Sequence, residues 1–186
     1  AGQVNGTSGY EEAAGQGLWA GTNAALWLQG REPFVLGRHE AYLGVMVDDL
    51  ILTNPSEPYR MFSSRAEYRL LLRSDNADRR LTPRAAEIGL VEAERGQRVD
   101  AKAERVRQTL ALLGSERQAG HTLAEILRRP ETTLESLLPA HPDLAGLEPD
   151  LARTIEVEVK YSGYIQRQED NVRRAARQEN LAIPAD

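Results

Sequence analysis

Hydrophobic positions recur with helical spacing through the second half of the chain. The first set lies three or four residues apart, as one buried face of a helix requires. Its members are Val99, Ala103, Val106, Leu110 and Leu113. This spacing predicts an amphipathic helix that ends at Gly114. From about Val91 onward we therefore expect a helical region.

Two Thr-x-x-Glu pairs predict the starts of shorter helices in the same region. Thr122 is followed by Glu125, and Thr132 by Glu135. In such a capping box the threonine oxygen accepts the backbone N–H three residues on, and the glutamate reaches back to the N–H of the cap. Pro139 to Pro149 is rich in turn residues and predicts a connector.

The segment from Asp150 to Glu179 fits two patterns. Alternating apolar residues would suit a strand, and these are Ile155, Val157, Val159 and Tyr161. Helical spacing fits as well, through Leu151, Ile155, Val159, Ser162 and Ile165. Because the flanks are strongly helix-forming, we predict one long helix with two apolar faces.

The first 30 residues combine a glycine-rich loop with a stripe of small residues. Ser8 and Glu11 form a further capping box that predicts a helix start. Along that helix small side chains recur every three or four residues, at Ala13, Gly17, Gly21 and Ala24 or Ala25. Such a stripe lets a backbone approach a partner surface closely, and the helix N-terminus suits an anionic or carbonyl-rich ligand. A tightly packed structural helix is the alternative.

Between these regions the pattern is weaker. Ala41 to Leu52 is almost continuously apolar and predicts a buried helix or a strand. We interpret its acids, Asp48 and Asp49, as capping or salt-bridge partners, because adjacent side chains point in different directions. The Thr82-Pro83 pair predicts the start of a short helix that Gly89 ends.

Composition excludes several classes of site. The 186 residues are 41% hydrophobic and 27% charged, which indicates a soluble globular protein. The start shows no signal-peptide pattern, and we expect a cytoplasmic location. Since there is no cysteine, disulfides, thiolate catalysis and cysteine-ligated zinc are excluded within the chain. The histidines His39, His121 and His141 lack metal-ligand spacing. The start at Ala1, without methionine, leads us to expect a piece of a longer protein.

An arginine-rich stretch from Pro58 to Thr82 changes this picture, because the chain as a whole has a formal net charge of −5. A capping box of Ser64 and Glu67 would start a helix with arginines stacked on one face. The stacked residues would be Arg65, Arg69 and Arg73. Arginine grips phosphate in two places and stacks on bases, so the stretch predicts a polyanion-binding surface. A salt-bridged, solvated face is the alternative.

Several stretches resemble the MnmG (GidA) family of flavin-dependent tRNA-modifying proteins. They are AGQVNGTSGYEEAAGQGL from Ala1, AYLGVMVDDL from Ala41, EPYRMFSSRAEYRLLLRSDNADRRLT from Glu57, RRPETTLESL from Arg128 and VKYSGYIQRQ from Val159. The resemblance implies an enzyme that holds FAD, uses NADH and a folate one-carbon donor, and works with the GTPase MnmE. It implies addition of a carboxymethylaminomethyl or aminomethyl group at C5 of a tRNA wobble uridine, in a homodimeric parent protein.

The resemblance also implies sites and domains. Residues near the flavin would be Gln3, Gly6, Thr7, Ser8 and Gly9. Residues that face tRNA would be Arg60, Arg65, Arg69 and Arg73, with Arg60 the leading candidate. The expected fold is mainly α, with the closing loop and helix of a Rossmann-type FAD-binding domain in 1–30, a connector in 31–90 and a truncated C-terminal helical domain in 91–186.

The chain departs from the family in three respects. The glycine fingerprint for a dinucleotide and the family's catalytic cysteines are absent, and the chain stops at Asp186, where family members continue through a further small helical module. We therefore expect a C-terminal fragment without catalytic residues of its own, which binds tRNA and a partner and does not hold FAD well alone. A purely structural or dimer-interface module, whose arginines pair internally, is the competing hypothesis.

Overall fold

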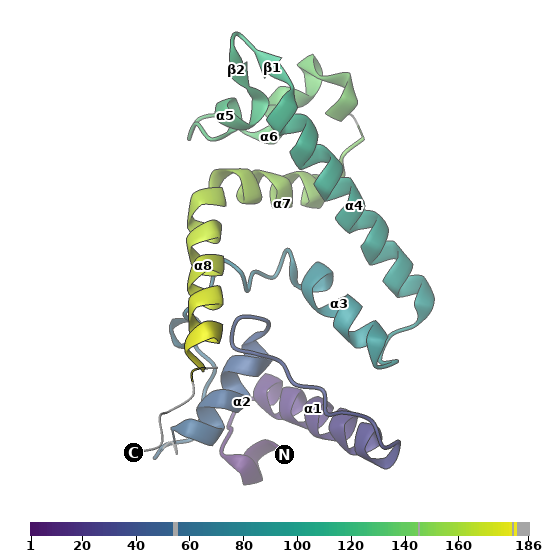
Figure 1. Cartoon of the computed structure of the whole chain (residues 1–186), viewed down its shortest axis with the longest axis vertical. Coiled ribbons are helices and arrows are strands. Elements are labelled where there is room, and N and C mark those ends of the chain that lie inside the picture. The colour runs from purple at the N-terminus through teal and green to yellow at the C-terminus, as the bar shows by residue number, and fades with distance from the viewer. Residues whose placement is uncertain (54–55, 145, 180, 182–186) are drawn as a thin grey trace. The chain divides into compact units, whose positions relative to one another are not determined.

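The computed structural model describes residues 1–53, 56–144, 146–179 and 181. The chain is mainly helical, which confirms the predicted fold class (Figure 1). The helices are α1 (Tyr10–Leu28), α2 (Tyr42–Leu52), α3 (Ala77–Glu87), α4 (Ala93–Ser115), α5 (Leu123–Leu127), α6 (Leu134–Leu137), α7 (Pro149–Lys160) and α8 (Ser162–Glu179). Single 3-10 turns lie at Gly2–Asn5, Ser63–Arg65, Leu138–Ala140 and Pro142–Leu144. The strands β1 (Arg117–Gln118) and β2 (His121–Thr122) form a small antiparallel hairpin.

Two compact units make up the chain. Unit 1 comprises Ala1–Arg73 and Pro83–Leu90, and unit 2 comprises Ser74–Thr82 and Val91–Asp186. Their boundary passes through α3 between Thr82 and Pro83. Among the described residues, no helix has the length and hydrophobicity needed to span a membrane.

Unit 2 is built around a leucine-rich core. Helices α4, α5, α6 and α7 converge there, as the upper part of Figure 1 shows. The core contains Val106, Leu113, Leu123, Leu127, Leu134, Leu137, Leu144, Leu147, Ile155 and Val159. The predicted helix from the Val99 region is α4, and it ends at Ser115, one residue beyond Gly114. Its buried positions include three of the predicted apolar residues, namely Val99, Val106 and Leu113.

The caps of the short helices are set by side chains. Thr122 and Glu125 form the predicted capping box at the start of α5. The prediction for α6 was wrong by one residue, because Thr133 and Ser136 form its capping box. A carboxylate oxygen of Glu156 accepts a hydrogen bond from Leu134 N–H at 2.8 Å, which fixes this later start.

The single long helix predicted from Asp150 to Glu179 is wrong, because Tyr161 separates α7 from α8. The helical choice over a strand is confirmed. The Ser162 hydroxyl donates to Val159 O at 3.0 Å, in competition with the helical ladder. Helix α7 contributes buried residues to the core, whereas α8 contributes none and leaves α7 at a steep angle (Figure 1).

In unit 1, α1 packs against α2, where Gly15 of α1 lies close to Leu43 and Met46. Its buried positions are Glu12, Gln16, Thr22 and Leu26. The predicted helix after Ser8 is therefore present, but Gly9 is its N-cap and no side chain caps it, so the Ser8–Glu11 capping box is wrong. Of the small-residue stripe, Ala13 is half-buried and the other members, Gly17, Gly21, Ala24 and Ala25, are exposed.

The segment from Ala41 to Leu52, for which the sequence predicted a helix or a strand, forms helix α2. Its close approach to the preceding segment depends on Gly44. A Cβ at this position would lie 2.3 Å from Gly37 O and 2.6 Å from Leu36 O, which are rigid backbone atoms. Val45, buried on the same helix, forms a small apolar cluster with Ala66 and Leu72.

The arginine-rich stretch does not form the predicted helix. Ser63–Arg65 is one 3-10 turn, and turns without regular structure follow it. The Ser64–Glu67 capping box is wrong, because Glu67 binds Arg38 instead. The helix expected to begin at Thr82-Pro83 begins earlier, at Ala77, and contains Pro83 in its interior.

Candidate nucleic-acid interface

The arginine-rich segment of unit 1, residues 57–73, lies along the glycine-rich loop. Tyr59 N–H donates to Gly6 O at 2.6 Å, and Ser8 N–H donates to Tyr59 O at 3.3 Å. One step further, Met61 N–H donates to the buried Glu12 carboxylate at 2.8 Å. This hydrogen bond, the largest cause, holds the pKa of Glu12 below its ordinary value. The backbone of the segment is thereby fixed against the start of α1.

Arg38 anchors the middle of the segment. Its guanidinium donates to Glu67 at 2.8 and 3.0 Å, to Asp49 at 2.6 Å and to Asp48 at 2.9 Å. It also donates to Arg65 O at 3.1 Å. The hydrogen bond to Glu67 raises the pKa of Arg38, against the effect of burial, so this cation stays charged. The interpretation of Asp48 and Asp49 as salt-bridge partners is confirmed.

Tyr59 connects these contacts in the interior of unit 1. Its ring is 1% exposed, and its hydroxyl donates to Asp49 Oδ2 at 2.8 Å. Burial, followed by the hydrogen bond to Asp49, raises the pKa of Tyr59, so the phenol remains a donor. The Arg65 guanidinium lies 4.6 Å above the ring centroid, where a cation–π contact favours it.

The four arginines predicted to face tRNA have different surroundings. Arg60 is 57% exposed, with Nε 3.6 Å from Glu12 Oε1. Arg65 donates to Arg60 O at 3.0 Å besides its contact with Tyr59. Arg69 is exposed, and its side chain has no partner in the described part of the chain. Arg73 is half-buried and donates to Leu70 O at 2.8 Å.

The remaining arginines of the stretch point to internal partners. In unit 2, Arg79 pairs with Glu158, and Arg80 donates to Asn76 at 2.8 Å. In unit 1, Arg84 pairs with Glu40. The stretch therefore contains internally paired arginines and exposed ones. In the segment Arg60, Arg65 and Arg69 are exposed, and of these Arg65 is held against the Tyr59 ring and Arg60 O.

The residues predicted to lie near a flavin form one continuous loop before α1. Gly6 has a φ of +85°, a left-handed conformation that favours glycine. Thr7 is buried, and its hydroxyl accepts from Gln16 Nε2 at 3.0 Å. Gln3 and Ser8 are exposed, so their side chains are accessible to a ligand.

The start of α1 is already occupied by a carboxylate. Gly9 is the N-cap, and a Cβ there would lie 1.7 Å from Glu12 Oε2. Glu12 also accepts its own backbone N–H, and Glu11 lies in the same first turn. A phosphate at this helix end would meet two negative charges. The loop therefore fits a neutral carbonyl group of a flavin better than its pyrophosphate.

A cavity of about 470 Å³ lies beside this helix end, within unit 1. Its floor is apolar, and Glu11, Glu12 and Arg60 add charge. The apolar lining consists of Gly15, Tyr42, Leu43, Met46 and Met61. The sequence did not indicate this cavity, because its lining comes from three segments that only tertiary contacts bring together. Apolar walls with a few polar groups suit a small flat ligand.

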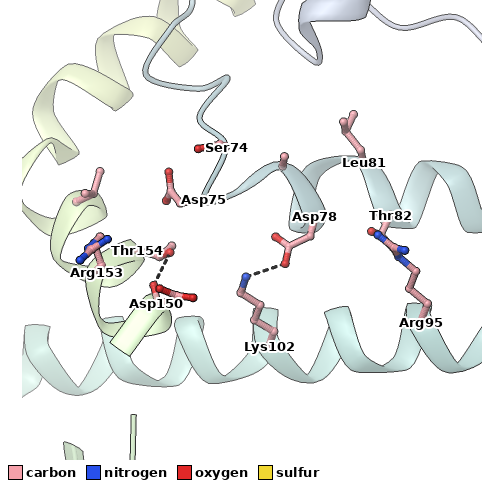
Figure 2. Close-up of a pocket in the computed structure, with 12 residues that line it drawn as sticks. Ser74, Asp75, Asp78, Leu81, Thr82, Arg95, Lys102, Asp150, Arg153 and Thr154 are labelled. Atoms are coloured by element: carbon pink, nitrogen blue, oxygen red, sulfur yellow. Dashed lines mark hydrogen bonds and ion pairs between the residues drawn. The ribbon is translucent and has the colours of Figure 1, made fainter. Parts of the chain in front are cut away.

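Unit 2 contains a cavity of about 790 Å³ between α3, α4 and α7, which Figure 2 shows. Its cations are Arg95, Lys102 and Arg153, and its carboxylates are Asp75, Asp78 and Asp150. Lys102 and Asp78 form an ion pair at 2.7 Å. Because charges of both signs line this cavity, it offers no selective attraction for an anion. The described residues contain no cluster of histidine and acidic side chains that could hold a metal ion.

Comparisons with known proteins agree with this architecture. Residues 77–169 match the family described as tRNA modifying enzyme MnmG/GidA C-terminal helical domain, and residues 1–32 match Glucose inhibited division protein A. The tRNA uridine 5-carboxymethylaminomethyl modification enzyme MnmG of Geobacter sulfurreducens is 50% identical, with 100% of this chain and 33% of that protein covered. The corresponding enzyme of Roseiflexus sp. is 49% identical over 100% of this chain and 30% of its own length.

Solved structures give the same result. The structure of Aquifex aeolicus GidA in its form II crystal matches with a TM-score of 0.88 and 38% identity, over 100% of this chain and 32% of that one. The chain thus spans about a third of the length of the relatives that it matches. Together with the match of residues 77–169, this shows that the chain belongs to the MnmG/GidA family of tRNA-modifying enzymes.

Proposed function

We propose that this chain is the tRNA-contacting part of an enzyme that modifies C5 of a tRNA wobble uridine. The relatives carry the name of that modification enzyme, which supports the proposal. The reaction adds a carboxymethylaminomethyl or aminomethyl group and uses FAD, NADH and a folate one-carbon donor. The GTPase MnmE is the proposed partner, and the whole protein is a homodimer. Catalytic cysteines lie outside this chain, which contributes recognition.

The observation that carries the RNA-binding role is the fixed, irregular backbone of the arginine-rich segment. Hydrogen bonds to Glu12 and Arg38 fix the backbone at Met61 and Arg65, and the exposed guanidinium groups of Arg60 and Arg69 lie on either side of this fixed part. A preorganised arginine loses less side-chain entropy when it binds phosphate. In this proposal Arg60 and Arg69 make the leading contacts, while Arg65 and Arg73 also hold the segment.

The flavin-facing role of the loop rests on its shape and charge. The tight turn at Gly6 and the exposed side chains of Gln3 and Ser8 form a polar edge without cations. We place a neutral part of the flavin ring at this edge, with Thr7 and Gly9 shaping the backbone. The bound flavin would supply the redox chemistry of the enzyme.

Binding of tRNA to the chain tests the proposal. Substituting Arg60, Arg65 and Arg69 together by alanine removes three cations, and we expect at least a tenfold loss of affinity at 0.1 M salt, since each released phosphate contact costs counterion-release free energy. The matched control replaces Arg98, Arg107 and Arg117, which are exposed on α4 and the hairpin of unit 2. Equal affinity of the two triple variants in a gel-shift titration would contradict the proposal.

A structural or dimer-interface module is the second candidate, and internal pairing favours it. Arg65, Arg79 and Arg84 each contact a residue of their own unit. This function predicts that the first triple variant melts at a lower temperature and binds tRNA unchanged. Melting curves and titrations of the same samples separate the two candidates.

A further inference from the structure

A basic cavity of about 430 Å³ lies at the junction of α7 and α8 in unit 2. Three cationic side chains line it, and none of its lining residues is acidic. The lining residues are Arg128, Lys160, Ser162, Gly163, Tyr164 and Arg167. It differs from the cavity in Figure 2, where carboxylates balance the cations. This cavity therefore attracts anions.

The cations around the cavity are largely available. Arg128 is exposed, and its side chain has no partner among residues that the structure describes. The Arg167 guanidinium lies 5.7 Å from the ring centroid of Tyr164. Lys160 Nζ lies 3.0 Å from Glu156 Oε1, and the other carboxylate oxygen of Glu156 accepts from Leu134 N–H. Because Glu156 pairs with one of the three cations that line the cavity, the site keeps a net positive charge.

Exposed aromatic rings stand beside these charges. Tyr164 is 59% exposed and Tyr161 is 45% exposed, although large aromatic rings are normally covered. Their ring centroids are 6.4 Å apart with an interplanar angle of 51°. An exposed ring next to arginines is the arrangement that binds single-stranded nucleic acid, because the bases stack and the cations hold the phosphates.

We infer that the α7–α8 junction binds an unpaired RNA nucleotide, whose base stacks on Tyr164 and whose phosphate lies among Arg128, Lys160 and Arg167. A base-paired duplex would present only its backbone and could not use the ring. The inference rests on the proposed function, since it makes the same tRNA the ligand. It adds a site in unit 2 to the arginine-rich segment of unit 1.

Binding of the full chain to a single-stranded 12-nucleotide RNA tests this inference, with an RNA hairpin of the same length for comparison. Tyr164→Leu should weaken single-strand binding by about fivefold or more, because one stacked base is lost. The Tyr164→Phe variant keeps the ring and should bind within about twofold of the wild type. Arg128→Gln and Arg167→Gln should each lower the slope of log affinity against log salt by about one. Tyr164 is exposed, so its replacement leaves the fold intact.

The outcomes separate the two proposals. Photo-crosslinking of 5-iodouridine RNA should label Tyr164, and labelling elsewhere only would overturn the inference. Unchanged affinity of Tyr164→Leu, with reduced affinity of the Arg60–Arg69 variants, would overturn the inference and leave the proposed function intact. Tight binding of polyglutamate that competes fully with RNA would assign the cavity to an acidic protein and overturn it too. Absence of RNA binding by the wild-type chain would overturn both.

Discussion

The leucine core of unit 2 and the arginine-rich segment of unit 1 are stabilised in different ways. In unit 2, buried apolar side chains from α4, α5, α6 and α7 contact one another. In unit 1, the apolar cluster around the segment is small, with Val45, Ala66 and Leu72 at its centre. Hydrogen bonds supply the remaining stabilisation: Arg38 and Tyr59 donate, and the Glu12 carboxylate accepts from Met61 N–H.

The difference teaches how a basic stretch can be both structural and functional. Carboxylates hold one group of arginines inside each unit, as the buried Asp49 and the exposed Glu67 hold Arg38. The exposed group, Arg60 and Arg69, projects from the support so formed. A helix with stacked arginines, as the sequence indicated, would have placed them on one solvated face with less restraint.

The largest expected effect comes from Gly44→Ala in α2. The new Cβ would collide with the backbone oxygens of Gly37 and Leu36, so we expect a loss of about 3 kcal/mol in the free energy of unfolding of unit 1. Gly21→Ala in α1 is the matched control, because nothing lies within 4 Å of its Cβ position. It should stabilise α1 by about 0.5–1 kcal/mol. Urea denaturation measures both, and equal effects would contradict the close packing of α2.

Arg38→Met should have the next largest effect. The substitution leaves Asp48, Asp49 and Glu67 without their common cation. We expect the free energy of unfolding of unit 1 to fall by about 2 kcal/mol, which lies between the values typical of surface and of buried ion pairs. Hydrogen exchange should speed up in residues 59–67 and stay unchanged in the leucine core of unit 2. The control Arg107→Met removes an exposed pair with Glu104 and should cost less than about 0.5 kcal/mol. If exchange in the segment is unaffected, Arg38 does not anchor it.

A smaller effect should appear in acid. The folded-state pKa of Glu12 is below its ordinary value of 4.5, so its stabilisation is complete above that value and is lost as the pH falls through the lowered pKa. As the pH is lowered below about 4.5, the protection of the Met61 amide against hydrogen exchange should therefore decrease before that of the Ile155 amide in α7. In the Glu12→Gln variant this acid-induced decrease in protection of the Met61 amide should disappear. A parallel loss at both amides would show that the two units respond to acid together.

The sequence predicted unit 2 well because local signals decide its elements. The spacing of Val99, Val106 and Leu113 predicted α4, and the Thr122–Glu125 pair predicted the start of α5. The sequence did not predict the break at Tyr161, because residues on both sides favour helix. The two helices differ in burial, since α7 has buried residues and α8 has none.

In unit 1 the missing information is long-range. Glu67 matches a capping box locally, but Arg38, 29 residues earlier in the chain, takes its carboxylate. Glu12 likewise receives the N–H of Met61, 49 residues away. The arginine-rich stretch could be identified as a polyanion-binding candidate from composition, whereas the division between anchored and exposed arginines required the tertiary structure.

The central claim is that exposed and internally paired arginines of unit 1 have separate tasks, and the salt dependence of tRNA affinity tests it most directly. For Arg60→Gln with Arg69→Gln, we expect the slope of log affinity against log salt to fall by about two, with an unchanged melting temperature. For Arg65→Gln with Arg84→Gln, we expect a lower melting temperature and a clearly smaller fall in slope. A larger fall in slope for the Arg65 and Arg84 double variant than for the Arg60 and Arg69 double variant would contradict the account.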